Sequence, residues 1–215
     1  MKQIHPGIFR KNDSIYTEAA SEESVYGETF LAEDGQKYRK WDASRSKVGA
    51  AVQKGINLEV ERDDEVLYLG AASGTTVSHF SDILTDGFVF GVEYSETVIR
   101  DLLNVAESRE NIAPILGNAR NPEEYSDLVG DCDVVFQDIS QSDQPEIFLK
   151  NCEKYLKDDG VGLLAVKAQS ISTAEEPEKV FKEVKEKLSD KFEIIAETTL
   201  EPYETAHLFL KLKKK

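Results

Sequence analysis

Hydrophobic and polar positions follow two different patterns along this chain, and the pattern changes near residue 65. Before it, residues 7–20 and 24–42 contain short alternating runs broken by Asn-Asp and Asp-Gly turns, which is typical of antiparallel strands. The segment 46–56 then has helical spacing, with Val48, Ala51, Val52 and Ile56 on one side. We therefore expect a small antiparallel β-rich unit over residues 1–50 and a larger domain over residues 51–215.

From residue 65 onward, apolar runs of strand length alternate with segments of helical spacing. The predicted strands cover 66–71, 88–94, 112–119, 132–139 and 160–168, and the predicted helices cover 77–84, 96–109, 144–156 and 176–190. Two more strands, 192–200 and 207–213, are expected to close the chain as an antiparallel pair. This alternation predicts an α/β, Rossmann-like fold, with a mostly parallel sheet covered on both faces. In such sheets ligands bind beyond the carboxyl ends of the strands.

Composition narrows the class of protein. The chain has 215 residues, of which 31% are charged, and a formal net charge of −15. This charge argues against a protein that coats nucleic acid by bulk attraction, but it leaves room for RNA docked by a local basic patch or a partner. Cys132 and Cys152 lack metal-site spacing, so we expect reduced, structural thiols and no metal. No apolar run approaches the roughly 20 residues of a membrane span, and the N-terminal segment lacks the apolar core of a signal peptide. We expect a cytoplasmic protein without membrane contact.

The turn between the first strand and helix of the larger domain reads "GAASGTT". Small residues let the backbone approach a ligand closely, and a strand–turn–helix setting is typical of nucleotide-like cofactors. The turn lacks the GK[ST] ending of a P-loop, the GxGxxG spacing of dinucleotide-binding proteins and any basic residue for phosphates. These features favour S-adenosylmethionine; the alternative is a tight connection without a ligand. The predicted contacts are Gly70, Ala71, Ala72, Ser73, Gly74, Thr75 and Thr76.

Further cofactor contacts are expected at the next two strand ends. Glu93 follows Gly74 by 19 positions, where a carboxylate can accept hydrogen bonds from ribose hydroxyls; alternatively it caps the following helix. Asn118 is a candidate partner for an adenine edge, with the backbone N–H of Ala119 beside it, although asparagine also forms turns. Tyr94, Asp138 and Gln141 complete the predicted cofactor set.

Several motifs, taken in order, resemble the fibrillarin family over nearly the whole chain. They are "RKWDASRSKVGAAVQKG", "VLYLGAASGTT", "GVEYS", "NIAPILGNAR", "DVVFQDISQ", "GLLAVKAQSI" and "LEPYETAHLFL". The short β-rich N-terminal unit, without a nucleolar Gly/Arg-rich tail, resembles the archaeal form. The resemblance implies an S-adenosylmethionine-dependent RNA ribose 2′-O-methyltransferase that modifies rRNA and tRNA. It also implies three partners in a box C/D guide ribonucleoprotein: a Nop-domain scaffold protein, a kink-turn-binding protein and the guide RNA.

Two positions depart from the family pattern. Asn118 stands where the family commonly has aspartate, and Gln137 stands where it commonly has an acidic residue. An amide can still donate to and accept from an adenine edge, so cofactor binding is expected to survive. Side chains alternate along a strand, so Gln137 is expected to face away from a site that contains Asp138.

Methylating a ribose 2′-hydroxyl requires a base near that hydroxyl. A lysine can serve as this base if burial or a neighbouring cation lowers its pKa. The family resemblance assigns a catalytic set of four: Lys47, Asp138, Lys167 and His207. We expect Lys167 to be the general base, Asp138 to orient it, Lys47 to act on it by like-charge proximity, and His207 to position the group. Taken alone, Lys47 is typical of a helix surface and His207 of a structural histidine, as is His79.

Basic residues gather just before this set and predict contacts with RNA phosphates. They are Lys37, Arg39, Lys40 and Arg45, with Asp42 as the one acid among them. The alternative is a solvated basic turn.

Two other functions remain open at this point. A small-molecule methyltransferase of the same fold would turn over without RNA or protein partners. A non-catalytic assembly subunit would keep the fold without binding S-adenosylmethionine. The missing GxGxxG spacing disfavours a nicotinamide-dependent oxidoreductase.

Overall fold

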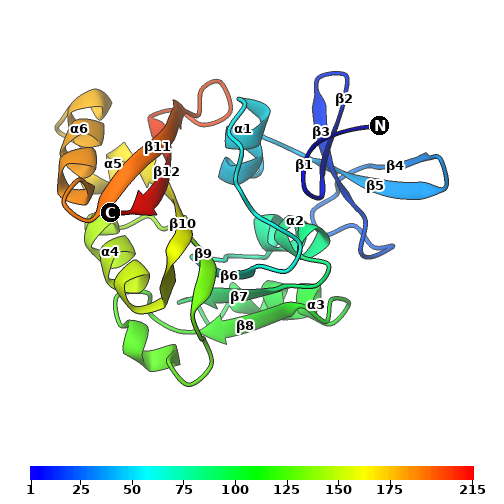
Figure 1. Ribbon diagram of the computed structural model, residues 1–215, viewed down its shortest axis with the longest axis horizontal. Helices are drawn as coiled ribbons and strands as arrows, with labels where there is room; N and C mark the ends of the chain where they lie inside the picture. Colours follow the sequence, from blue (N-terminus) through cyan, green and yellow to red (C-terminus); the bar gives the residue numbers. More distant parts are fainter.

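Two β-sheets organise residues 1–215, all of which the computed structural model describes (Figure 1). The smaller sheet is antiparallel throughout and confirms the predicted N-terminal β unit. Its strand order is β1-β2-β3-β5-β4. The strands are β1 (Lys2–His5), β2 (Ile8–Lys11), β3 (Ser14–Glu18), β4 (Phe30–Glu33) and β5 (Gln36–Trp41).

The larger sheet has seven strands in the order β11-β12-β10-β9-β6-β7-β8. The pairs from β10 to β8 are parallel, whereas β12 runs antiparallel to both β10 and β11. This arrangement confirms the predicted Rossmann-like sheet and its terminal antiparallel pair. Its strands are β6 (Glu65–Leu69), β7 (Phe88–Glu93), β8 (Ile112–Leu116), β9 (Cys132–Gln137), β10 (Leu156–Lys167), β11 (Phe192–Thr199) and β12 (His207–Lys214).

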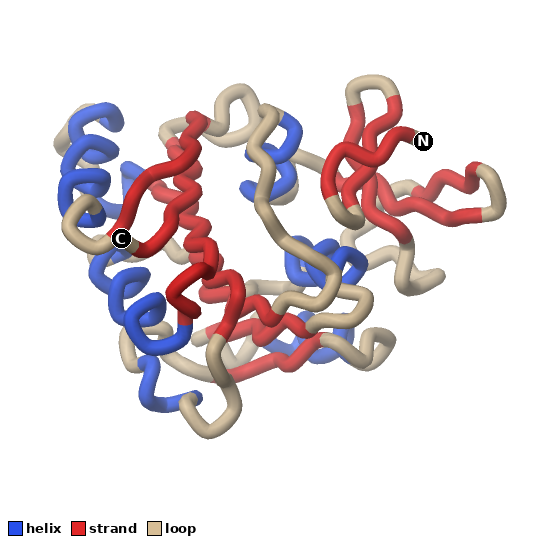
Figure 2. The backbone as a smooth tube through the Cα atoms, viewed as in Figure 1, coloured by secondary structure: helices blue, strands red, loops and turns tan.

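Helices cover both faces of the larger sheet, as Figures 1 and 2 show. One face is covered by α4 (Gln144–Tyr155) and α6 (Pro177–Leu188), with the short α5 (Ala168–Ile171) beside them. The other face is covered by α1 (Lys47–Gln53), α2 (Thr75–Ile83) and α3 (Ile99–Ala106). A 3-10 turn, η1 (Pro122–Tyr125), precedes β9.

Alternation along the central strands divides the core in two. Tyr68 and Phe136 point to the α2 face, where their rings meet edge to face 4.7 Å apart. Leu67 and Val135 point to the opposite face, in the core that also contains Phe148 of α4. Burial of both faces explains why these strands are almost continuously apolar.

The core on the α2 face extends into the N-terminal sheet. Ile8, Ile15 and Trp41 belong to the same buried cluster as Phe80 of α2. The predicted division between residues 50 and 51 falls inside α1, whose buried side contributes to this cluster. The N-terminal sheet is therefore packed onto the larger domain through a continuous apolar core.

Both cysteines are free and buried, which confirms that they are structural thiols. Burial raises the pKa of the Cys132 thiol to about 12 and that of Cys152 well above its ordinary value. Neither thiol is therefore ionised near neutral pH. None of the helices combines the length and the apolar character needed to cross a bilayer.

Candidate active site

Strands β6 and β9 are neighbours at the centre of the larger sheet, and their carboxyl ends lie side by side. After β6 the chain continues to β7 on one side of this pair, and after β9 it continues to β10 on the other side. Gly70 follows β6 with φ at +82°, and a Cβ there would lie 2.3 Å from the carbonyl oxygen of Asp138. The Asp138 N–H donates to the Leu69 carbonyl at 2.9 Å. Glycine is therefore required at position 70 for the first loop to pass against Asp138.

A cavity of about 370 Å³ opens at this switch point, the place where open α/β sheets bind ligands. Eight predicted cofactor residues line it: Gly70, Ala72, Glu93, Tyr94, Asn118, Ala119, Asp138 and Gln141. Six further residues line it that the sequence prediction missed: Val92, Gly117, Arg120, Ile139, Ser140 and Ile147. Most of these lie beside a predicted contact in the chain, so extending each strand-end motif by one or two residues would have found them.

The rest of the "GAASGTT" turn does not line this cavity. Ser73 and Thr75 instead line a second hollow, of about 400 Å³, with Tyr26 and Arg45. Ala71 is buried. Gly74 caps α2 with φ at +90°. Thr76 is also buried, and its hydroxyl donates to the hydroxyl of Ser46 at 2.9 Å. These residues therefore shape the loop, and the loop meets the cavity through Gly70 and Ala72.

Glu93 is held in place at the cavity wall by two backbone groups. Its carboxylate accepts hydrogen bonds from the N–H of Ala72 at 3.0 Å and of Ser95 at 2.8 Å. A carboxylate has about four acceptor positions, so this one retains acceptors for ribose hydroxyls. Glu93 does not cap the following helix, because α3 begins at Ile99 without a side-chain cap; its carboxylate orders the turn after β7 and leaves acceptors for the cofactor.

Asn118 forms a turn at the cavity wall. Its side-chain oxygen accepts from the N–H of Arg120 at 3.0 Å. Its side-chain NH2 group remains available as a donor to a ligand. The turn interpretation therefore holds for the Asn118 oxygen.

The charges around the cavity suit a cation without phosphate groups. Arg120 is the one basic residue of the wall, and its guanidinium is bound to Asp143 at 2.7 and 2.8 Å and to Gln141 at 2.7 Å. The carboxylates of Glu93 and Asp138 remain on the wall. S-adenosylmethionine carries a positive sulfur, two ribose hydroxyls and no phosphate, so these residues fit it.

Asp138 forms an ion pair with Lys47, with Nζ 2.9 Å from Oδ2. Lys47 is the first residue of α1, and Ser46 caps that helix by accepting from the Gly49 N–H at 3.0 Å. The hydroxyl bond from Thr76 to Ser46 ties the start of α1 to the start of α2. Asp138 was expected to orient Lys167, and in this structure its carboxylate is paired with Lys47.

Lys167 and His207 lie opposite each other where β10 ends and β12 begins. The Lys167 side chain forms no ion pair and lies half-buried. His207 is buried, with Nδ1 2.8 Å from the Thr205 carbonyl. A carbonyl can only accept, so Nδ1 carries the proton and Nε2 is left free. The four predicted catalytic residues thus gather along adjoining ends of β9, β10 and β12 and the start of α1.

Of the predicted RNA-binding residues, Arg39 was assigned wrongly. It is 0% exposed, and its guanidinium pairs with Glu28 at 2.7 Å and with Asp82 at 2.8 Å. Its position on β5 turns it inward, toward α2. Lys40 and Arg45 are exposed, and Lys37 is half-buried and paired with Glu22. The exposed basic patch is therefore smaller than the sequence indicated.

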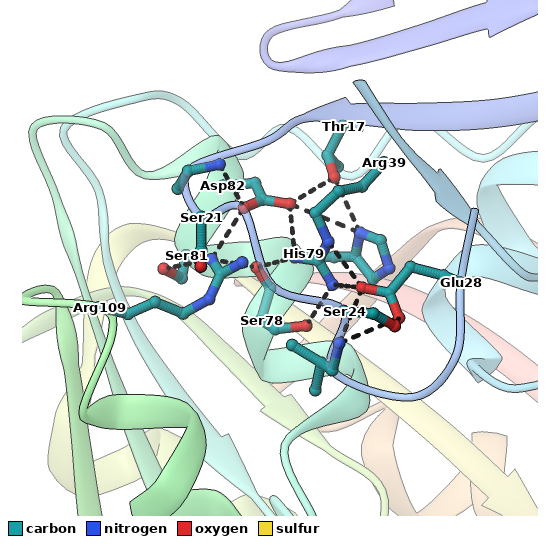
Figure 3. A network of polar contacts seen from close by, with 12 residues as sticks. Thr17, Ser21, Ser24, Glu28, Arg39, Ser78, His79, Ser81, Asp82 and Arg109 are labelled. Atoms are coloured by element: carbon teal, nitrogen blue, oxygen red, sulfur yellow. Dashed lines mark hydrogen bonds and ion pairs between the residues drawn. The ribbon is translucent and has the colours of Figure 1, made fainter. Parts of the chain in front are cut away.

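The polar network around Arg39 joins the N-terminal sheet to α2 (Figure 3). Asp82 receives hydrogen bonds from Thr17 at 2.6 Å, Arg39 at 2.8 Å and Arg109 at 2.8 Å. Burial, together with the charges of Arg39 and Arg109, lowers the pKa of His79 well below its ordinary value, so the ring is neutral. This network confirms His79 as a structural residue.

Glu28 is the second acid of this network. Burial alone raises the pKa of Glu28. Hydrogen bonds from the backbone of Tyr26 and Val25 and the charge of Arg39 outweigh it and lower that pKa to about 2. Arg39 therefore pairs with two buried carboxylates, of which Glu28 stays ionised near neutral pH.

Comparisons with known proteins agree with this geometry. The fibrillarin family model matches residues 1–215. A fibrillarin-like rRNA/tRNA 2′-O-methyltransferase of Pyrococcus horikoshii is 44% identical over 221 residues, which cover 99% of this chain and 97% of that protein.

Solved structures of fibrillarins also superpose closely on this chain. The Methanococcus jannaschii fibrillarin has a TM-score of 0.95 at 38% identity, covering 99% of this chain and 96% of its own. Fibrillarin in a complex with Nop5p has a TM-score of 0.93 at 40% identity, and both chains are fully covered. The Aeropyrum pernix fibrillarin, with natively bound S-adenosyl-L-methionine, has a TM-score of 0.89 at 39% identity, covering 98% of this chain and 96% of its own. This chain belongs to the fibrillarin family.

Proposed function

We propose that this protein is the S-adenosylmethionine-dependent RNA ribose 2′-O-methyltransferase subunit of a box C/D guide ribonucleoprotein, acting on rRNA and tRNA. The observation that carries this proposal is the Lys47–Asp138 ion pair, which lies at the wall of the cofactor cavity beside the strand ends that hold Lys167 and His207. The Pyrococcus horikoshii relative is described as an rRNA/tRNA 2′-O-methyltransferase, which supports the same substrate class.

The chemistry divides between the cofactor and these side chains. When bound, S-adenosylmethionine supplies an electrophilic methyl group on a positively charged sulfur. Lys167, as a neutral amine, would accept the proton of the ribose 2′-hydroxyl as that oxygen takes the methyl group, while the methyl–sulfur bond breaks and S-adenosylhomocysteine leaves. Lys47, held by Asp138, places a positive charge where RNA phosphate approaches. His207 is held in orientation by its Nδ1–H, which donates to the Thr205 carbonyl, and its Nε2 makes no hydrogen bond within the chain.

We further propose that RNA reaches this site through partners: a Nop-domain scaffold protein, a kink-turn-binding protein and the guide RNA. The net charge of −15 opposes bulk attraction of RNA, and burial of Arg39 leaves few exposed basic residues near Lys47. A partner that docks the guide–target duplex supplies the missing affinity. The solved fibrillarin–Nop5p complex supports a scaffold of this kind.

Transfer of a tritiated methyl group from S-adenosylmethionine tests the proposal. In the particle reconstituted with its scaffold, kink-turn protein and guide RNA, we expect the label on one guide-paired nucleotide of the target. A matched target with 2′-deoxyribose at that nucleotide is the control, since it lacks the acceptor hydroxyl, and we expect it to stay unlabelled. Labelling of the deoxy target, or of small molecules without RNA, would contradict the proposed acceptor.

Removing the Glu93 carboxylate is expected to weaken cofactor binding specifically. A hydrogen bond to a charged group contributes about 1.5–3 kcal/mol, so Glu93→Ala should raise the Kd for S-adenosylmethionine about tenfold or more. Titration calorimetry on the purified protein measures this change. Glu96→Ala is the control, because Glu96 is exposed on the same turn and lies off the cavity wall. Equal affinity of the two variants would show that Glu93 does not touch the cofactor.

A further inference from the structure

Gln144 is a fully buried amide that contacts the backbone of Lys167 on both its polar groups. The Gln144 Oε1 accepts from the Lys167 N–H at 3.1 Å, and Nε2 lies 3.3 Å from the Lys167 carbonyl. Gln144 is 0% exposed, so water does not compete for these bonds. The amide therefore binds Lys167 as a neighbouring β-strand would, through one acceptor and one donor.

The need for this contact follows from the sheet itself. Strand β9 pairs with β10 only as far as Gln137 opposite Leu164, three residues before Lys167. On the other side, β12 continues and places His207 opposite Lys167. Without Gln144, the N–H and carbonyl of Lys167 would have no partner on the β9 side. Gln144, the first residue of α4, binds these two groups in place of a β9 residue.

The same amide also reaches the wall of the cofactor cavity. Nε2 donates to the carbonyl of Gln141 at 2.8 Å, and Gln141 lines the cavity with Asp138. The start of α4 is fixed in turn by Gln137, whose Nε2 donates to the Gln144 carbonyl at 2.8 Å. Gln137 lies off the cavity wall, as alternation with Asp138 predicted. One buried side chain thus connects the segment after β9 with the end of β10.

We propose that Gln144 is a positioning residue that holds Lys167 at a fixed place relative to the cofactor cavity. This inference rests on the proposed function, in which Lys167 is the general base. A base must lie within hydrogen-bond reach of the hydroxyl it deprotonates, and a displacement of about 1 Å can cost two orders of magnitude in rate. Gln144 limits that displacement by tying the backbone of Lys167 to the segment that lines the cofactor cavity.

The test is Gln144→Met, which keeps the length of the side chain and removes the amide. In the reconstituted particle we expect the single-turnover rate to fall about tenfold or more, with the KM for S-adenosylmethionine and for target RNA within about threefold of the wild type. Asn111→Leu is the control, because it removes a half-buried amide that donates to the carbonyls of Ser81 and Leu84 and touches neither Lys167 nor the cavity wall. We expect the control to keep the wild-type rate.

A double variant separates positioning from a general structural effect. If Gln144 acts through Lys167, adding Gln144→Met to Lys167→Ala lowers the residual single-turnover rate no further. The same fold loss in both backgrounds, or a wild-type rate in Gln144→Met, would overturn the proposal.

A second substitution covers the case in which Gln144→Met does not fold. Gln144→Glu keeps the acceptor for the Lys167 N–H and loses both donor contacts, and we expect its rate to fall as well. Melting temperature and cofactor affinity report on the fold of each variant. Failure of the proposed function would appear differently, as an absence of RNA methylation by the wild-type particle.

Discussion

Replacing Lys167 with alanine is expected to lower the single-turnover rate of RNA methylation about 10²–10⁴-fold, the usual contribution of a general base. Of the two lysines at the site, Lys47 is engaged in an ion pair with Asp138, whereas Lys167 forms none. Lys167 also lies opposite His207, at the end of β10 next to the strand that leads to Asp138. It is therefore the lysine of the site whose side chain no carboxylate engages, which leaves it available to the ribose hydroxyl.

The measurement uses tritiated S-adenosylmethionine in the reconstituted particle, with cofactor affinity determined in parallel. Lys150→Ala serves as the control, because Lys150 is an exposed lysine on α4, away from the cavity wall. We expect Lys167→Ala to bind the cofactor normally and Lys150→Ala to be fully active. A Lys167→Ala protein within about threefold of the wild-type rate would remove Lys167 from the role of base.

Replacing Arg39 with methionine is expected to destabilise the protein by about 3–5 kcal/mol, because the change leaves one buried carboxylate, that of Glu28, without a cation. Arg39 is 0% exposed, and it pairs with both Glu28 and Asp82. Asp82 keeps Arg109, whereas Glu28 loses the one guanidinium it contacts. We expect the substitution to weaken the packing of the N-terminal sheet against α2, because these charged groups join the two (Figure 3).

Urea denaturation followed by circular dichroism measures the free energy of unfolding. Lys40→Met is the matched control, since Lys40 is the next residue of β5 and is exposed. We expect the control to change stability by less than about 0.5 kcal/mol, as exposed substitutions usually do. Equal stabilities for the two variants would mean that the buried network contributes nothing measurable.

Strand and helix positions followed from the sequence because periodicity reports burial directly. The runs that became β6, β7 and β9 are apolar on both faces, and such runs occur where helices cover a sheet on both sides. The predicted cofactor cavity followed as well, since strand ends of one parallel sheet meet at one edge. Gly70 and Glu93 were identifiable for that reason.

Side-chain partners did not follow from the sequence, because they depend on directions that the pattern leaves open. Arg39 sits in a basic run, and composition alone placed it in solvent. The twist and packing of β5 against α2 turn it into the core. Asp138 was expected to orient Lys167, and the structure pairs its carboxylate with Lys47 at the start of α1. No sequence motif pointed to Gln144, whose role depends on β9 ending before β10 does.

The sequence by itself determined the fold class, the two β units and the cofactor edge of the sheet, and its resemblance to the fibrillarin family named the four candidate catalytic residues. Local periodicity and motif order carry that information. Only the tertiary structure decided which lysine Asp138 holds, which basic residue is buried and which amide supports Lys167. Those choices depend on contacts between residues far apart in the chain: 91 positions for Lys47 and Asp138, and 43 for Arg39 and Asp82. Such contacts exist only once the N-terminal sheet and the helices have packed against the larger sheet.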